Sequence, residues 1–173
     1  MPDHVERTFQ KIRDMEVRGA GRIARAAAEA LKRKALEIRT SDPQAFYQEL
    51  YRAGRRLKEA RPTAVSLPNA VNYVLLEAYR GLEKGLPIEE LRHLVVKRAE
   101  EFIQRSLEAI KRIGEIGSKR IMQGDAILTH CNSEAAVKVI LEAHRQGKGI
   151  KVFVTETRPR SVSYTHLTLP TKA

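Results

Sequence analysis

The hydrophobic pattern of this 173-residue chain changes its period once, at Gly124, and that change most limits how the chain can fold. Before it, apolar residues recur at the spacing of amphipathic helices, most clearly at Ile23, Ala26, Ala27, Ala30, Leu31 and Ala35. After it, residues 125–130 form a short apolar run without alternation, as in a strand buried on both faces of a parallel sheet. The sequence therefore predicts an α/β protein whose N-terminal part is all helical.

Proline and glycine divide the helical part into segments. We expect helices at residues 22–38, from Pro43 to just before Pro62, at about 69–82, and at 88–121. Asp42 precedes Pro43 and can cap the second of these. Gly114 and Gly117 weaken the last helix and suggest a bend or a handover between domains.

The segment after Gly124 has the order of one βαβ crossover. A strand at 125–130 is followed by a helix at 133–146 and a second strand at 150–155. The inner side of that helix is expected to carry Ala136, Val137, Ile140, Leu141 and His144. One crossover leaves both sheet edges and one sheet face uncovered, which is not stable alone. We therefore expect a helical domain at 1–121 and only the start of a doubly wound parallel sheet at 122–160.

The last residues do not continue this pattern. Residues 162–171 read as a translation of the adapter DNA used with a transposase in shotgun sequencing. We expect the native sequence to extend to about Arg160, residues 161–173 to be a non-native tail, and the rest of the sheet to be missing.

Composition restricts the class of partner and the compartment. The net charge of +11 attracts polyanions, but the cations of Lys32, Arg33 and Lys34 precede Glu37 in the pattern of a solvated helix face. Aromatic residues make up 5% of the chain, which argues against base stacking and hence against nucleic acid as the partner. No apolar run reaches the roughly 20 residues of a membrane helix, and no signal peptide is visible at the start. A single cysteine, Cys131, fits the reducing cytoplasm.

The turn after the first predicted strand, residues 130–133, combines a thiol with a helix N-terminus. In an open α/β sheet ligands bind beyond the carboxyl ends of the strands. The free N–H groups of Ser133, Glu134 and Ala135 would face an anion there, and the same helix end would favour the thiolate of Cys131. The alternative is a buried cysteine that packs as a small hydrophobe. The five histidines show no metal spacing and one cysteine cannot build a zinc site, so no metal is expected.

Three further segments could bind phosphate. Two glycines in residues 18–21 allow close approach of the backbone to a ligand before a helix, although on spacing alone a plain interhelical turn is the better explanation. Arg61 stands before a rigid proline and suits bidentate phosphate contact, although exposed helix-end arginines are common. Arg158 follows the second strand, where it could face the Cys131 turn or form a strand-end salt bridge.

Together these segments resemble one family. The stretches that carry the resemblance are residues 15–25, 61–69, 124–133 and 154–159, in that order. The family unites ribose-1,5-bisphosphate isomerases, methylthioribose-1-phosphate isomerases and the regulatory subunits of initiation factor 2B. In it, a helical domain precedes a Rossmann-like domain. The methylthioribose enzymes have proline where this chain has Gly21, so the resemblance favours the ribose bisphosphate branch.

The resemblance implies residue roles that spacing alone does not give. Cys131 corresponds to the catalytic base of the isomerases, and their catalytic acid, an aspartate, falls beyond this chain. The implied substrate-binding residues are Arg18, Gly19, Ala20, Gly21, Arg61, Ser133, Glu134 and Ala135, with Asn132 and Arg158 as further candidates. It also implies a phosphorylated sugar as substrate, no cofactor, and a homo-oligomer, either hexamer or dimer. A non-catalytic regulatory subunit and a methylthioribose-1-phosphate isomerase remain alternatives, and Cys131 argues for an enzyme.

Overall fold

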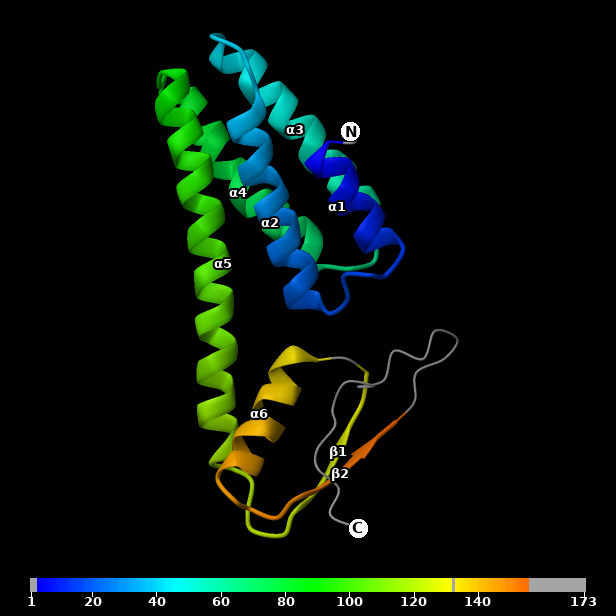
Figure 1. The fold of residues 1–173 in the computed structure, drawn as a ribbon. Coiled ribbons are helices and arrows are strands. Elements are labelled where there is room, and N and C mark those ends of the chain that lie inside the picture. The colour runs from blue at the N-terminus through cyan, green and yellow to red at the C-terminus, as the bar shows by residue number, and fades with distance from the viewer. Residues whose placement is uncertain (1–2, 132, 156–173) are drawn as a thin grey trace. The chain divides into compact units, whose positions relative to one another are not determined.

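The computed structural model describes residues 3–131 and 133–155 (Figure 1). Its elements are α1 (His4–Arg13), α2 (Ala20–Glu37), α3 (Pro43–Glu59), α4 (Ser66–Glu83), α5 (Ile88–Ser118), β1 (Ala126–Thr129), α6 (Glu134–Arg145) and β2 (Lys151–Val154). Contacts divide the chain into two compact units, one up to Leu107 and one from Glu108 onward. The described part is thus mostly helical with a small parallel sheet. Among the described residues no helix is both long and apolar enough to cross a membrane.

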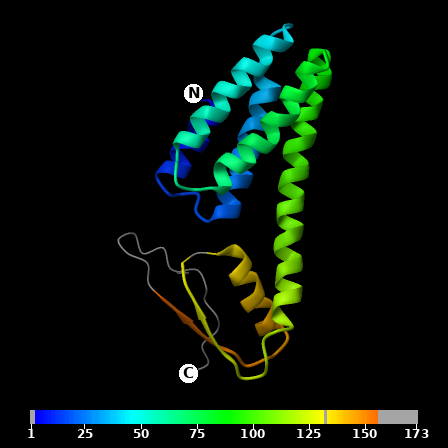
Figure 2. The same cartoon turned by 180° about the vertical axis from the view of Figure 1, so that it is seen from behind.

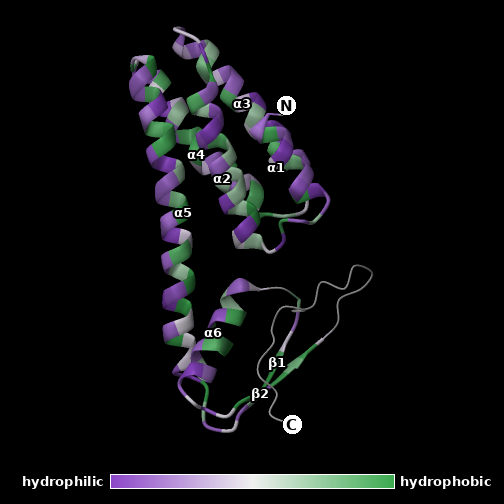
Figure 3. Ribbon diagram, in the orientation of Figure 1, coloured by the Kyte–Doolittle hydropathy of each residue, from purple (hydrophilic) through white to green (hydrophobic). Residues whose placement is uncertain are grey.

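The first unit is a helical bundle in which α2 contacts α1, α3 and α4. The stripe predicted on α2 is buried at Ile23, Ala27, Ala30, Leu31 and Ala35, whereas Ala26 is half-buried. The predicted face of α3 is buried as well, at Phe46, Leu50, Ala53 and Leu57. Figure 3 shows the hydrophobic and hydrophilic bands that alternate along these helices. The helical period therefore predicted the core of this unit correctly.

The start of α3 has the predicted cap. The Asp42 carboxylate accepts hydrogen bonds from the backbone N–H of Gln44 at 3.0 Å and of Ala45 at 3.2 Å. Pro43 follows in the first turn, where its missing N–H costs nothing. Two of the N–H groups that a helix start leaves without partners are thereby satisfied.

We expect Asp42→Ala to lower the free energy of unfolding by about 1 kcal/mol, the usual cost of losing such a cap. Urea denaturation followed by circular dichroism measures it. The matched control is Asp14→Ala, because among the described residues the Asp14 carboxylate pairs only with the exposed Arg13. An equal loss in both variants would contradict the capping role.

The prediction for α4 was wrong at its start. We expected a helix from about residue 69, but α4 begins at Ser66 and includes Pro68. Proline is tolerated in the first helical turn, where no intrahelical N–H bond is required. The helix predicted to reach residue 121 ends at Ser118.

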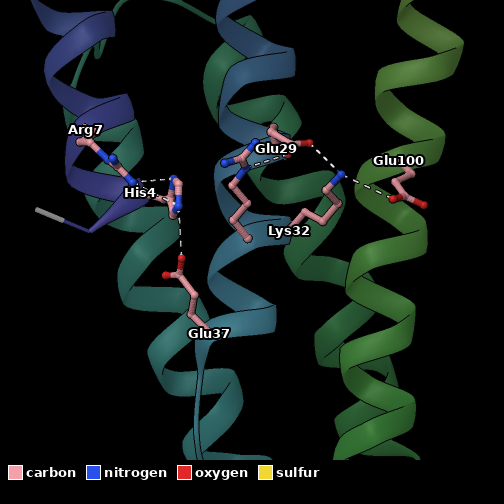
Figure 4. A network of polar contacts seen from close by, with 7 residues as sticks. His4, Arg7, Glu29, Lys32, Glu37 and Glu100 are labelled. Atoms are coloured by element: carbon pink, nitrogen blue, oxygen red, sulfur yellow. Dashed lines mark hydrogen bonds and ion pairs between the residues drawn. The ribbon is translucent and has the colours of Figure 1, made fainter. Parts of the chain in front are cut away.

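The charged residues of the first unit pair with one another, as the interpretation of a solvated helix face requires. Lys32 Nζ lies 2.9 Å from Glu29 Oε2 and 3.5 Å from Glu100 Oε1, which links α2 to α5 (Figure 4). The hydrogen bond with Glu29 raises the pKa of Lys32. His4 on α1 lies 3.5 Å from Glu37 on α2 in the same view. Part of the large positive charge is therefore engaged within the bundle.

A second ion pair should make stability depend on pH. Both carboxylate oxygens of Glu6 on α1 accept from Arg56 on α3, each at 3.0 Å. These hydrogen bonds, with one from Gln10, lower the pKa of Glu6. A lowered carboxylate pKa adds stability above the unfolded-state pKa, and this stability is lost as pH falls through the folded-state pKa.

Glu6→Gln should therefore lower the thermal midpoint at pH 7, and the difference from the wild type should vanish in acid, below the lowered pKa. Thermal melts over a pH series measure it. Glu16→Gln, which removes an exposed carboxylate of the same type, serves as the control. A difference that persists unchanged in acid would refute this account.

The second unit contains the predicted crossover. β1 and β2 pair in parallel from Ala126 with Lys151 to Thr129 with Val154, and α6 connects them. Both strands are one residue shorter at each end than predicted. Burial on both faces is not found, since Leu128 is 73% exposed and Phe153 57% exposed. Two strands leave a sheet face without cover, as expected of a single crossover.

The orientation of α6 corrects another prediction. Ile140 and Ala143 are buried, whereas His144, placed on the inner side by its spacing, is exposed. Ala136, Val137 and Leu141 are half-buried. The buried side of α6 is thus rotated toward Ala143.

The two glycines of α5 allow α6 to approach closely. A Cβ at Gly114 would lie 2.6 Å from Lys138 Cγ, and one at Gly117 would lie 2.6 Å from Val139 Cγ2. Lys148 Nζ also donates to the carbonyl oxygens of Ser118 and Ile121, beyond the last turn of α5. The end of α5 packs on α6, and contacts accordingly group residues from Glu108 onward in the second unit.

Candidate active site

Cys131 lies two residues after the end of β1, before the start of α6. Its side chain is exposed and its backbone adopts φ 64°, a left-handed conformation that non-glycine residues adopt rarely. Strain of this kind is common at functional sites. Exposure excludes the alternative of a cysteine buried as a small hydrophobe. The thiol is thus accessible to a ligand in solution.

The helix start beside the thiol is built as predicted. Ser133 is the N-cap of α6, and its hydroxyl accepts from the backbone N–H of Ala136 at 3.3 Å. Glu134 and Ala135 occupy the first turn and are half-buried. The first-turn N–H groups of a helix favour an anion. An exposed thiol and a helix N-terminus therefore lie within one short stretch of chain.

One contact in this region was not predicted. The Nδ1 atom of His130 is hydrogen-bonded to Thr155 Oγ1. The backbone N–H of Thr155 also donates to the carbonyl of Thr129 at 3.2 Å. These contacts tie the carboxyl end of β1 to that of β2, next to Cys131. The sequence did contain a signal for this contact, because His130 and Thr155 each directly follow one of two strands that pair in parallel.

The loop at residues 18–21 begins α2 without a side-chain cap. Gly19 is the N-cap residue with φ 85°, which favours glycine, and Arg18 Nε donates to the Met15 carbonyl at 2.7 Å. Ala20 and Gly21 form the first turn of α2. An uncapped helix start of this kind leaves backbone N–H groups available for an anion.

Arg61 follows α3 in a tight turn. Its carbonyl accepts from the N–H of Ala64 at 3.0 Å, and its half-buried side chain makes no hydrogen bond or ion pair with a described residue. Val17 and Ala64, from the two loops, pack against the same hydrophobic core. Figures 1 and 2 show both connections at the same end of the helical unit. The structure thus brings the Arg18 and Arg61 segments to one end of this unit.

The candidate residues form two groups, one in each unit. Arg18, Gly19, Ala20, Gly21 and Arg61 belong to the helical unit, and Cys131, Ser133, Glu134 and Ala135 belong to the unit with the sheet. Asn132 and Arg158 lie outside the described residues. Within residues 3–131 and 133–155, no group of three or more histidine, cysteine or acidic side chains could hold a metal ion.

Comparison with known proteins defines the class to which this fold and site belong. The chain matches the initiation factor 2 subunit family over residues 16–170, and it belongs to that family. The match extends into the segment that the sequence analysis assigns to a non-native tail. A solved structure of the translation initiation factor eIF-2B subunit delta from A. fulgidus has a TM-score of 0.73 at 30% identity, covering 92% of this chain and 48% of that one.

Within the family, the chain is similar to archaeal isomerases. It is 54% identical to the ribose 1,5-bisphosphate isomerase of Methanocaldococcus jannaschii over 162 residues, which are 94% of this chain and 50% of the relative. Identity to the methylthioribose-1-phosphate isomerase of Acetivibrio thermocellus is 36%, covering 86% of this chain and 45% of that protein. The chain thus spans about half the length of the curated relatives it matches.

Proposed function

We propose that the whole protein is a ribose-1,5-bisphosphate isomerase that converts α-D-ribose 1,5-bisphosphate to ribulose 1,5-bisphosphate in the degradation of nucleoside monophosphates. The observation that carries this proposal is the exposed, left-handed Cys131 at the start of α6. The 54% identity to a relative of that name supports the choice of substrate. Residues 122–160 would begin a Rossmann-like catalytic domain completed by chain beyond that region.

The two phosphates of the substrate would be held by backbone and arginine. The α2 start at Gly19, Ala20 and Gly21, with Arg18 and Arg61, would bind one phosphate. The α6 start at Ser133, Glu134 and Ala135, with Asn132 and Arg158 as further candidates, would bind an anionic group near the thiol. These contacts fix the sugar so that a positioned base meets one carbon.

In this proposal the Cys131 thiolate removes the proton from C2 of the sugar and becomes a thiol. The electron pair forms a double bond between C1 and C2, the bond from C1 to the ring oxygen breaks, and an acid protonates that oxygen. The resulting cis-enol loses the proton of its C2 hydroxyl, and the cis-enolate so formed is protonated at C1 to give the ketose. The acid would be an aspartate beyond this chain, and helix ends and arginines would stabilise the negative charge without a metal or organic cofactor.

The whole protein provides the test. It should convert ribose 1,5-bisphosphate, followed by ³¹P NMR, and should turn over methylthioribose 1-phosphate at least about 100-fold less efficiently, because a site built for a second phosphate rejects a substrate without one. Equal turnover of both substrates, or preference for the second, would assign the protein to the methylthioribose branch.

A second candidate is a non-catalytic regulatory subunit, favoured by the likeness to the eIF-2B subunit delta structure. Tight binding of ribose 1,5-bisphosphate by the whole protein without turnover would support it. We also propose a cytoplasmic homo-oligomer, either hexamer or dimer, which sedimentation of the whole protein measures.

The 173-residue chain alone should show no isomerase activity. Its described sheet has two strands with exposed Leu128 and Phe153, and the proposed acid lies beyond it. The same ³¹P assay measures this, with the whole protein as the positive control. Turnover by the 173-residue chain would contradict the proposed division of the active site.

A further inference from the structure

A pocket on the helical unit has the lining of a ligand site and uses none of the residues proposed for the isomerase. It lies between α4 and α5, has a volume of about 400 Å³, and is lined by Tyr73, Phe102, Arg105 and Ser106. Small-molecule sites are commonly of this size, with aromatic walls and a few polar groups. All four lining residues belong to the first unit.

The walls of the pocket are two aromatic rings. The Tyr73 and Phe102 ring centroids are 5.6 Å apart with their planes inclined by 50°. The guanidinium carbon of Arg98 lies 4.0 Å from the Tyr73 centroid, and this arginine is also within 4 Å of Glu77 and Glu101. Arg98 is thus neutralised by its own neighbours while it holds the Tyr73 ring in place. A flat ring is the shape that such walls accept.

The polar groups of the pocket are all poised to donate. Arg105 Nη1 donates to Tyr73 Oη at 3.4 Å, and Arg25 Nη1 donates to Ser106 Oγ at 3.1 Å. A hydroxyl that accepts from a guanidinium keeps its own hydrogen for another acceptor. Neither hydroxyl donates to an acceptor among the described residues. A ligand here must therefore bring acceptor atoms.

The charge that lines the pocket is positive and comes from Arg105. Its lining contains no carboxylate, and Arg105 makes no ion pair within the described part of the chain. By contrast, Arg98, about two turns of α5 away, meets two glutamates. Arginine beside hydroxyl donors is suited to a planar anionic group such as carboxylate, sulfonate or phosphate.

We propose that the pocket between α4 and α5 binds a small aromatic anion, with its ring packed against the wall that Tyr73 and Phe102 form together and its acidic group on Arg105, Ser106 and the Tyr73 hydroxyl. This site is additional to the isomerase site and does not depend on that function. It gives the helical unit a ligand-binding role of its own.

The probe is phenyl phosphate, titrated into the 173-residue chain by isothermal calorimetry. Inorganic phosphate and phenol, which carry the charge and the ring of the probe separately, are titrated in the same way. Saturable binding is expected for phenyl phosphate, with each half binding at least about tenfold more weakly, since ring and charge both contribute. Arg105→Gln should weaken binding by about tenfold or more, the usual effect of losing a charged hydrogen bond. Phe102→Leu should weaken it too, with unchanged circular dichroism to show that the bundle is intact.

Two control variants locate the ligand. Arg112→Gln, at another exposed arginine of α5, should leave binding unchanged. Arg61→Gln should also leave it unchanged, because Arg61 belongs to the proposed substrate site. The proposal is overturned if phenyl phosphate does not bind saturably, if inorganic phosphate binds as tightly, if Arg105→Gln binds like the wild type, or if Arg61→Gln weakens binding as much as Arg105→Gln does.

Discussion

Replacing Cys131 by serine should lower kcat of the proposed isomerase activity of the whole protein by about 10³-fold, within the range that a positioned general base contributes. A serine hydroxyl occupies nearly the same volume but does not ionise at neutral pH, so the variant keeps the shape of the turn and loses the base. Because the side chain is exposed in the turn before α6, the fold should not suffer. Steady-state assays with ribose 1,5-bisphosphate measure the effect.

The control for this prediction has two parts. The KM should change little, because the phosphates are held by other groups, and the circular dichroism spectrum should be that of the wild type. Arg112→Gln, a change at an exposed residue outside the candidate site, should retain full activity. A Cys131→Ser enzyme with wild-type kcat would remove the thiol from the mechanism.

Replacing Leu31 by alanine should lower the free energy of unfolding of the helical unit by about 3 kcal/mol. Leu31 on α2 is 0% exposed and belongs to the main hydrophobic core. The loss combines the hydrophobic transfer of the removed methyl and methylene groups with the cavity that a packed core cannot fill. Urea denaturation, followed by the helical circular dichroism signal, measures it.

The same helix offers a matched control. Leu36 is 48% exposed, so Leu36→Ala makes the same chemical change on the outer face of α2. Its effect should stay within about 0.5 kcal/mol, as for most surface substitutions. Similar losses in the two variants would mean that α2 does not pack as described.

The helical unit was largely predictable because its information is local. Stripes on α2 and α3 follow the helical period, and a capping aspartate followed by proline marks the start of α3. The start of α4 was missed because Pro68 was interpreted as a boundary, although proline fits a first turn. On α5, Ile113 has an apolar side chain within the predicted last helix but is 45% exposed. The helical period shows which side of a helix is apolar, but it does not show how much of that side other elements bury.

The second unit was predictable in order but not in detail. The period change at Gly124 and the glycines around residue 148 predicted a strand, a helix and a strand, and the two strands pair in parallel. The outward position of His144 could not be read from spacing, since a half-buried helix admits more than one inner side. Gly114 and Gly117 were interpreted as a bend because close packing against Lys138 and Val139 is a tertiary contact.

The candidate site was likewise predictable where its signals are local along the chain, and not where it depends on contacts between distant residues. The turn with Cys131 and Ser133 was located from strand and helix signals, because both residues sit at a boundary that the sequence marks. The pairing of His130 with Thr155 depends on two strands that meet in space, 25 residues apart along the chain. Likewise, the pocket at Tyr73 and Arg105 joins side chains from α4 and α5 that no local pattern relates.

The most direct measurement is release of deuterium from C2. Ribose 1,5-bisphosphate carrying deuterium at that carbon is incubated in ordinary water with the whole protein or with its Cys131→Ser variant, and deuterium in the solvent is followed by NMR. If the sulfur is the group that takes this hydrogen, the wild type moves deuterium from C2 either into the solvent or to C1 of the product, which NMR also detects, and the variant moves essentially none. Equal release by both proteins would show that another group removes it.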